Sequence, residues 1–140
     1  MSIYIVDASI AAKLFLVEEY ADDALAVMEG DHRLHAPDFF LLEMDSIICK
    51  WIRRGVITAS DGDQARAAVE EVPIKIYPSM SLRDSAYSIA NQTRRSFYDC
   101  LYVALAVLLE GRMVTADRRL YEAVSDGPFT DHVRWVEDVS

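Results

Sequence analysis

Short runs of apolar, β-branched residues alternate along the chain with longer stretches in which apolar residues recur every three or four positions. The short runs predict buried strands near residues 3–6, 34–36, 74–77, 112–115 and 133–136. The stretches between them predict helices near residues 9–17, 20–29, 38–54, 60–71, from 81, 96–109 and 117–124. Strands that alternate with helices indicate an α/β fold in three α/β/α layers, with a central, mainly parallel sheet of four to five strands.

The composition agrees with a folded chain and excludes several classes of protein. Of the 140 residues, 52% are hydrophobic and 26% are charged, and no linker or repeat interrupts residues 1–140, so we expect a single domain. The longest apolar run, Cys100–Leu109, is too short to cross a bilayer, and the start of the chain lacks the basic region of a signal peptide. We therefore expect a cytoplasmic protein without a membrane anchor.

The charge balance limits how the chain can meet a polyanion. Fourteen Lys and Arg against 23 Asp and Glu give a net charge of -9, which disfavours field-driven attachment to nucleic acid. The chain would therefore have to bind a nucleic acid through a local feature, either a metal ion or a basic patch. The two cysteines, Cys49 and Cys100, lie in apolar helical patterns without paired spacing, which favours buried free thiols. The three histidines lack the spacing of a zinc site, so a bound metal would be a hard ion held by oxygen.

Four carboxylates are the candidates for chemistry. Asp7 and Asp117 directly follow predicted strands, where they either cap the next helix or project at the carboxyl edge of the sheet. Asp99 fits the capping pattern that begins at Ser96, yet ten apolar residues follow it and draw it towards the interior. Glu43 lies at the border of the apolar stripe of helix 38–54 and has no basic residue three or four positions away.

Each acid alone has an ordinary structural explanation, but the predicted topology lets all four converge at one edge of the sheet. Carboxylates about 5 Å apart repel by roughly 1 to 3 kcal/mol per pair, which would raise their pKa values unless a cation neutralised them. Mg²⁺ or Mn²⁺ is the simplest such cation, because both prefer carboxylate oxygen.

Four short motifs carry a resemblance to a known family. They read Ile5-Val6-Asp7-Ala8-Ser9, Ala36-Pro37-Asp38 leading to Leu42-Glu43, Tyr98-Asp99-Cys100-Leu101-Tyr102-Val103-Ala104-Leu105-Ala106, and Val114-Thr115-Ala116-Asp117-Arg118-Arg119-Leu120. In these motifs and their order the chain resembles the PIN-domain ribonucleases, and more closely the VapC-type toxins of toxin-antitoxin pairs. The likeness spans residue 3 to about residue 120. One departure is Ser46, which stands where the family often has Asn.

The resemblance implies a PIN-like fold and an endoribonuclease that hydrolyses RNA phosphodiester bonds with one or two Mg²⁺ (or Mn²⁺) ions. It also implies inhibition by a cognate antitoxin and, commonly, a homodimer. The four acids would be both the metal ligands and the catalytic groups, directly or through water. Candidate supporting hydroxyls are Ser9, Thr115 and Ser46, although ordinary turn hydroxyls explain the first two equally well. Candidate RNA contacts are Lys13, Lys50 and Arg118, for which scattered surface charge is the alternative.

Three other functions are weighed against this one. An inactive PIN-fold module that binds RNA or protein would keep the fold, but such relatives are expected to lose at least one acid. A phosphoacceptor signalling domain is also acidic, parallel and Mg²⁺-binding, yet it needs a lysine after a late strand, and the last lysine here is Lys75. A haloacid-dehalogenase-like phosphatase would need an aspartate where Ser9 stands.

Overall fold

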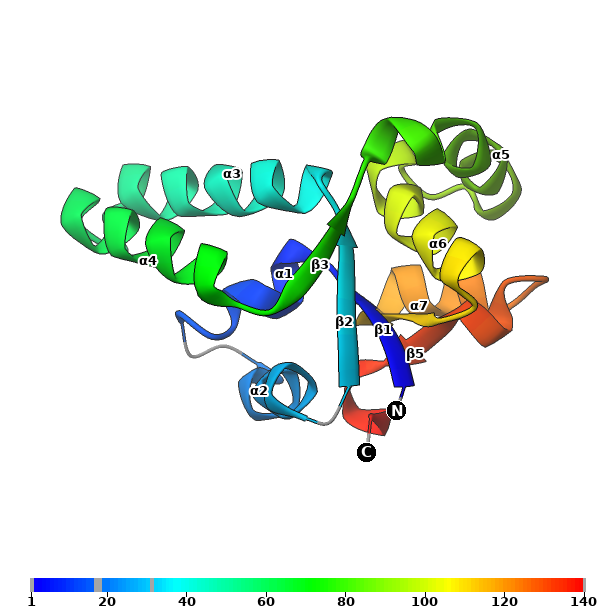
Figure 1. Cartoon of the computed structure of the whole chain (residues 1–140), viewed down its shortest axis with the longest axis horizontal. Coiled ribbons are helices and arrows are strands. Elements are labelled where there is room, and N and C mark those ends of the chain that lie inside the picture. Colours follow the sequence, from blue (N-terminus) through cyan, green and yellow to red (C-terminus); the bar gives the residue numbers. More distant parts are fainter. Residues whose placement is uncertain (1, 17–18, 31, 140) are drawn as a thin grey trace.

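A five-stranded sheet lies at the centre of the computed structural model, which describes residues 2–16, 19–30 and 32–139 (Figure 1). All four strand pairs are parallel, and the strand order is β3-β2-β1-β4-β5. The strands are β1 (Ser2–Val6), β2 (His32–Pro37), β3 (Ile74–Tyr77), β4 (Arg112–Thr115) and β5 (Val133–Trp135). The five predicted strands are therefore all present, within two residues at each end.

Helices cover both faces of this sheet. They are α1 (Ala8–Ala12), α2 (Ala21–Glu29), α3 (Phe39–Arg53), α4 (Ala59–Glu71), α5 (Arg83–Thr93), α6 (Phe97–Leu109) and α7 (Arg118–Ser125). In Figure 1, α1 and α2 lie on one side of the sheet with the projecting α3–α4 hairpin, and α5, α6 and α7 lie on the other. This arrangement confirms the predicted three-layer α/β/α fold.

The strand order reverses between β1 and β4, which lie side by side in the sheet. They pair in parallel, with Tyr4 opposite Arg112 and Val6 opposite Val114. The connection that leaves β1 passes over one face, and the connection that leaves β4 passes over the other. In open α/β sheets, ligand sites form outside the carboxyl ends of two such strands. The fold therefore provides a crevice next to the ends of β1 and β4.

Helix α6 anchors this crevice because it is buried nearly all round. Every residue from Cys100 to Ala106 is buried, as the continuous apolar run predicts. Helix α3 instead buries one stripe, formed by Phe40, Met44 and Ile48, and exposes the opposite face. Burial therefore holds α6 and the buried stripe of α3 in place. The opposite side of α3 is open to solvent.

The start of α5 differs from its prediction. The chain enters a 3₁₀ turn at Ser79–Leu82 before α5 begins at Arg83, so Ser81 does not cap this helix. The reason is a pair of long-range hydrogen bonds: the Ser79 N–H donates to Asp38 Oδ1, and the Phe39 N–H donates to Ser79 Oγ. This pair of bonds fixes the start of α3 against the segment after β3.

Helix α1 is also shorter than the predicted helix 9–17. After Ala12, the N–H groups of Lys13, Leu14 and Phe15 bond to carbonyls three residues back, which tightens the chain into turns. The predicted end of this helix at Val17 lies outside the described residues.

The two cysteines are free, but only Cys100 is buried. The expectation that Cys49 is buried is wrong, because Cys49 lies about 100° around α3 from the buried Ile48 and so turns to solvent. Within the described residues, every helix is too short or too polar to span a bilayer.

Candidate active site

Asp7 leaves the end of β1 with its side chain held in place by its neighbours. Its Oδ1 accepts hydrogen bonds from the Ser9 hydroxyl at 2.7 Å and from the Ile10 N–H at 3.1 Å, so Asp7 caps α1. Burial raises the pKa of the Asp7 carboxyl, and the negative charge of Asp99 adds to this rise, while the two hydrogen bonds oppose it. Helix capping and a place at the sheet edge, which the sequence left as alternatives, both apply to Asp7.

Glu43 enters from α3 and meets Tyr102 of α6. The buried Tyr102 hydroxyl donates a hydrogen bond to Glu43 Oε1, a contact between residues 59 positions apart in the chain. Burial raises the pKa of Glu43 from 4.5 to about 7, and the charges of Asp7 and Asp99 contribute to the rise, while the Tyr102 bond opposes it. Burial also raises the pKa of Tyr102, which keeps its hydroxyl a donor.

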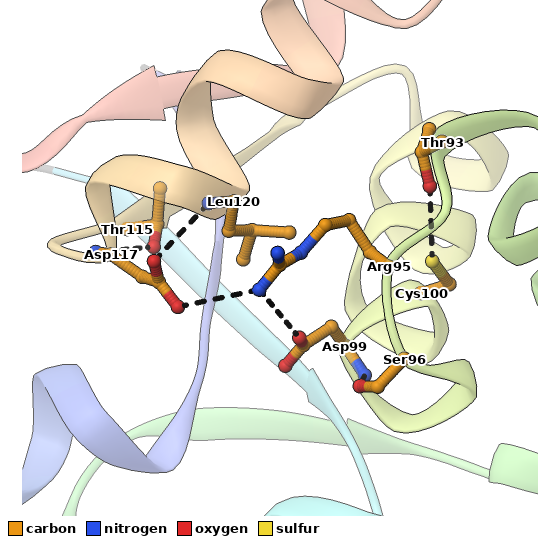
Figure 2. A network of polar contacts seen from close by, with 8 residues as sticks. All are labelled: Thr93, Arg95, Ser96, Asp99, Cys100, Thr115, Asp117 and Leu120. Carbon is orange, nitrogen blue, oxygen red and sulfur yellow. Dashed lines mark hydrogen bonds and ion pairs between the residues drawn. The ribbon is translucent and has the colours of Figure 1, made fainter.

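Asp99 and Asp117 face each other across a single arginine (Figure 2). Arg95 Nη2 lies 3.9 Å from Asp99 Oδ2 and 3.9 Å from Asp117 Oδ2. Asp117 also caps α7 by accepting the Leu120 N–H at 3.2 Å, and its own N–H donates to Thr115 Oγ1 at 3.0 Å. The two carboxylates therefore share one positive charge, although neither contact is as short as a close ion pair.

The four acids line one pocket, which we call the carboxylate pocket. It has a volume of about 270 Å³, and its walls are Asp7, Ser9, Lys13, Glu43, Ile47, Asp99, Ala116, Asp117 and Leu120. The acids come from four separate segments of the chain: the ends of β1 and β4, the second turn of α3, and the first turn of α6. The predicted convergence at the carboxyl edge of the sheet is therefore observed.

Comparison with known proteins agrees with this geometry. The family model described as PIN domain matches residues 4–125. The chain belongs to the PIN domain family. Ribonuclease VapC3 of Pyrobaculum aerophilum is 30% identical over 123 residues, which cover 84% of this chain and 92% of the relative. Ribonuclease VapC9 of Mycobacterium tuberculosis is 33% identical over 116 residues, which cover 83% and 87%.

Solved structures resemble this PIN domain over almost its full length. The crystal structure of PAE2754 from Pyrobaculum aerophilum superposes with a TM-score of 0.69 at 22% identity, covering 97% of this chain and 90% of that one. The resemblance to PIN-domain ribonucleases of the VapC type, inferred from four short motifs, is confirmed by the family match and by these relatives.

The other predicted site residues lie at different distances from the PIN carboxylates. Ser9 and Lys13 line the carboxylate pocket, and the fully buried Thr115 holds the backbone of Asp117. Ser46 and Lys50 line a neighbouring cavity instead. The Arg118 guanidinium stacks on the Trp135 ring at 3.8 Å and does not line the carboxylate pocket, so its contact with RNA stays a prediction.

Sequence reasoning missed two residues that contact the PIN carboxylates. Tyr102 follows Asp99 by three positions on α6, which places the two on the same helix face, but its partner Glu43 lies on α3. Arg95 lies just before the N-cap of α6, where its position four residues before Asp99 is a weaker signal. Tyr102 reads as core because most of its neighbours are apolar. Arg95 reads as one of many surface cations, although its Nε is buried and has no hydrogen-bond partner among the described residues.

The donors around the carboxylate pocket suit a hard divalent ion. In the described part of the chain, no three His, Cys, Asp or Glu side chains already form a group that could hold a metal ion. All four carboxyls are instead engaged by protein donors. Asp7 accepts from Ser9 and Glu43 from Tyr102, while Asp99 and Asp117 share Arg95. The carboxylate oxygens and the pocket that they share nevertheless fit such an ion.

Proposed function

We propose that this chain is a metal-dependent endoribonuclease that hydrolyses RNA phosphodiester bonds at the carboxylate pocket. The observation that carries the proposal is the meeting of Asp7, Glu43, Asp99 and Asp117 in one pocket of a PIN-family chain. Relatives that align along more than four fifths of the chain are named ribonucleases, which supports the same activity.

The four carboxylates would hold Mg²⁺ or Mn²⁺, directly or through water. When bound, such an ion supplies an acidified water and neutralises charge on the phosphate. The chain's own residues prepare this site: Ser9 orients Asp7, Tyr102 orients Glu43, and Thr115 fixes the backbone of Asp117. Lys13 lines the same pocket and is a candidate contact for an RNA phosphate.

We further propose that the chain is the toxin of a toxin-antitoxin pair. A toxin-antitoxin complex from Klebsiella pneumoniae superposes with a TM-score of 0.63 at 13% identity, covering 99% of this chain and all of that one. This likeness concerns the fold, and together with the VapC names of the relatives it supports inhibition by a cognate antitoxin. A homodimer acting on RNA in the cytoplasm completes the proposal and follows from the family resemblance.

The deciding experiment is cleavage of total RNA by the purified protein with Mg²⁺ or with EDTA. We expect cleavage with Mg²⁺ alone, and a loss of at least about 100-fold in Asp7→Asn and in Asp99→Asn, because each removes a ligand charge. Asparagine also caps helices, so Asp7→Asn preserves the start of α1. Asp63→Asn, an exposed change on α4, is the matched control and should cleave like the wild type.

Cleavage that persists in both pocket variants, while circular dichroism shows an intact fold, would contradict the assignment. RNA binding by the wild type without cleavage in Mg²⁺ or Mn²⁺ would instead favour an inactive PIN-fold binding module.

A further inference from the structure

A second cavity adjoins the carboxylate pocket and has no role in the function proposed above. Its volume is about 480 Å³, and it is lined by Phe39, Leu42, Glu43, Ser46, Ile47, Lys50 and Tyr98. Glu43 and Ile47 line both, so the two hollows are neighbours along α3. A polymer that places a phosphate among the carboxylates can therefore extend into this second cavity.

An aromatic stack forms one wall of the second cavity. The rings of Phe39 and Tyr98 lie nearly parallel, with centroids 4.7 Å apart and an angle of 13° between their planes. Phe97 meets Tyr98 edge to face at 5.6 Å. Tyr98 nevertheless exposes 57% of its surface. A large aromatic ring that is supported from one side and open on the other is a ready stacking platform.

The platform is fixed to the same elements that carry the acids. Phe39 opens α3, where its N–H bonds to Ser79 Oγ, and it precedes Glu43 by one helical turn. Tyr98 directly precedes Asp99, so their Cα atoms are about 3.8 Å apart. Because the two cavities share Glu43 and Ile47 as walls, a planar group stacked on Tyr98 would lie close to whatever occupies the carboxylate pocket.

The far end of the second cavity is polar. Ser46 and Lys50 follow Glu43 by three and seven positions on α3, which places them on the same face, with Lys50 about 10 Å along the helix. Both residues are exposed, and no carboxylate of the described residues forms an ion pair with Lys50. The cavity thus combines a stacking ring, a hydroxyl and an ammonium group.

We propose that the second cavity is a nucleobase subsite, which stacks one unpaired base of the RNA on Tyr98 and places a flanking phosphate near Lys50. The proposal rests on the ribonuclease function and adds its substrate class, because only a base outside a duplex has a free face for Tyr98. Stacking is effective in a chain of net charge -9, since it needs no positive field.

Direct binding measurements test the subsite separately from cleavage. The probe is a short fluorescent oligoadenylate, titrated in EDTA, with oligouridylate and the oligoadenylate-oligouridylate duplex for comparison. We expect Tyr98→Ala to weaken oligoadenylate binding about 5- to 100-fold, with a smaller loss for oligouridylate because uracil stacks less well. Tyr98→Trp should restore binding. Tyr87→Ala is the control, because Tyr87 is 67% exposed on α5 and lies outside the second cavity.

Salt dependence distinguishes the two parts of the subsite. Lys50→Ala should reduce the slope of log affinity against log salt by about 0.7, the value for one phosphate contact with a single strand. Tyr98→Ala should leave that slope unchanged, because stacking releases no counterions. In Mg²⁺, Tyr98→Ala should raise KM for RNA more than it lowers kcat.

Equal oligoadenylate affinity of the wild type and Tyr98→Ala, including no binding by either, would overturn the subsite and leave the cavity to a protein partner. Failure of the wild type to cleave RNA would overturn the ribonuclease function alone, since binding in EDTA does not depend on it. A tyrosine-dependent preference for the duplex would also overturn the subsite.

Discussion

Replacement of Glu43 by glutamine should stabilise the metal-free protein at neutral and alkaline pH. The Glu43 carboxyl is partly buried near two other acids, and its pKa is about 7 in place of 4.5. Glutamine has almost the same shape and retains an oxygen that can accept the Tyr102 hydrogen bond. The change therefore removes a charge that the fold disfavours and keeps the contact that positions the side chain.

The size and sign of the effect follow from this pKa. Between about pH 4.5 and pH 7 the folded state retains a proton that the unfolded state has released, so the free energy of unfolding of the wild type falls as pH rises through this window. The full difference corresponds to about 3.4 kcal/mol. Because the carboxyl is partly exposed, solvent screening reduces our expectation to about 1 to 2 kcal/mol.

Urea unfolding in EDTA measures the gain at two pH values. At about pH 8.5 Glu43→Gln should be more stable than the wild type by the full amount, and at about pH 5.5 by less than half of it. Glu71→Gln, an exposed change at the end of α4, is the control and should show no such dependence. A gain that is equal at both pH values, or a loss at pH 8.5, would refute the assigned environment of Glu43.

Two further variants test the contacts around the carboxylate pocket. Arg95→Gln removes the cation that Asp99 and Asp117 share. Because this cation competes with a metal ion for the two carboxylates, its loss should raise Mn²⁺ affinity about 3- to 10-fold in titration calorimetry. Unchanged affinity would show that Arg95 does not compete with the metal ion. Tyr102→Phe removes a hydrogen bond that lowers the pKa of Glu43, so the pH at which Mn²⁺ affinity falls by half should rise by about 1 unit. A midpoint that stays in place or falls would contradict that effect of Tyr102.

Much of the fold was predictable because its signals are local. Strands that are mostly buried, such as β1 and β4, read as short apolar runs, and the glycines and prolines between elements mark their ends. The predictions failed where distant contacts decide the outcome. Ser81 has the sequence of a helix cap, but Asp38 and Phe39 bind Ser79 instead and move the helix start. Cys49 lies among apolar letters, yet it points away from the stripe that α3 buries.

The candidate site divides in the same way. The four acids could be predicted to converge because the parallel topology brings the ends of β1 and β4 to one edge and places the starts of α3 and α6 beside it. The groups that hold these acids were not predictable one by one. Whether Tyr102 reaches Glu43, or Arg95 reaches both Asp99 and Asp117, depends on how α3, α6 and α7 pack together.

Charge balance connects these contacts to the proposed chemistry. Without a metal ion, the carboxylate pocket moderates its negative charge through a proton on Glu43 below about pH 7 and through the guanidinium of Arg95. A divalent cation would bring two positive charges, so that neither the proton on Glu43 nor the guanidinium of Arg95 would be needed to balance the carboxylates. Ion binding should therefore strengthen as pH rises through the pKa of Glu43, and it should weaken the hold of Arg95 on Asp99 and Asp117. We therefore expect the same two groups, Glu43 and Arg95, to set the affinity of the proposed metal ion.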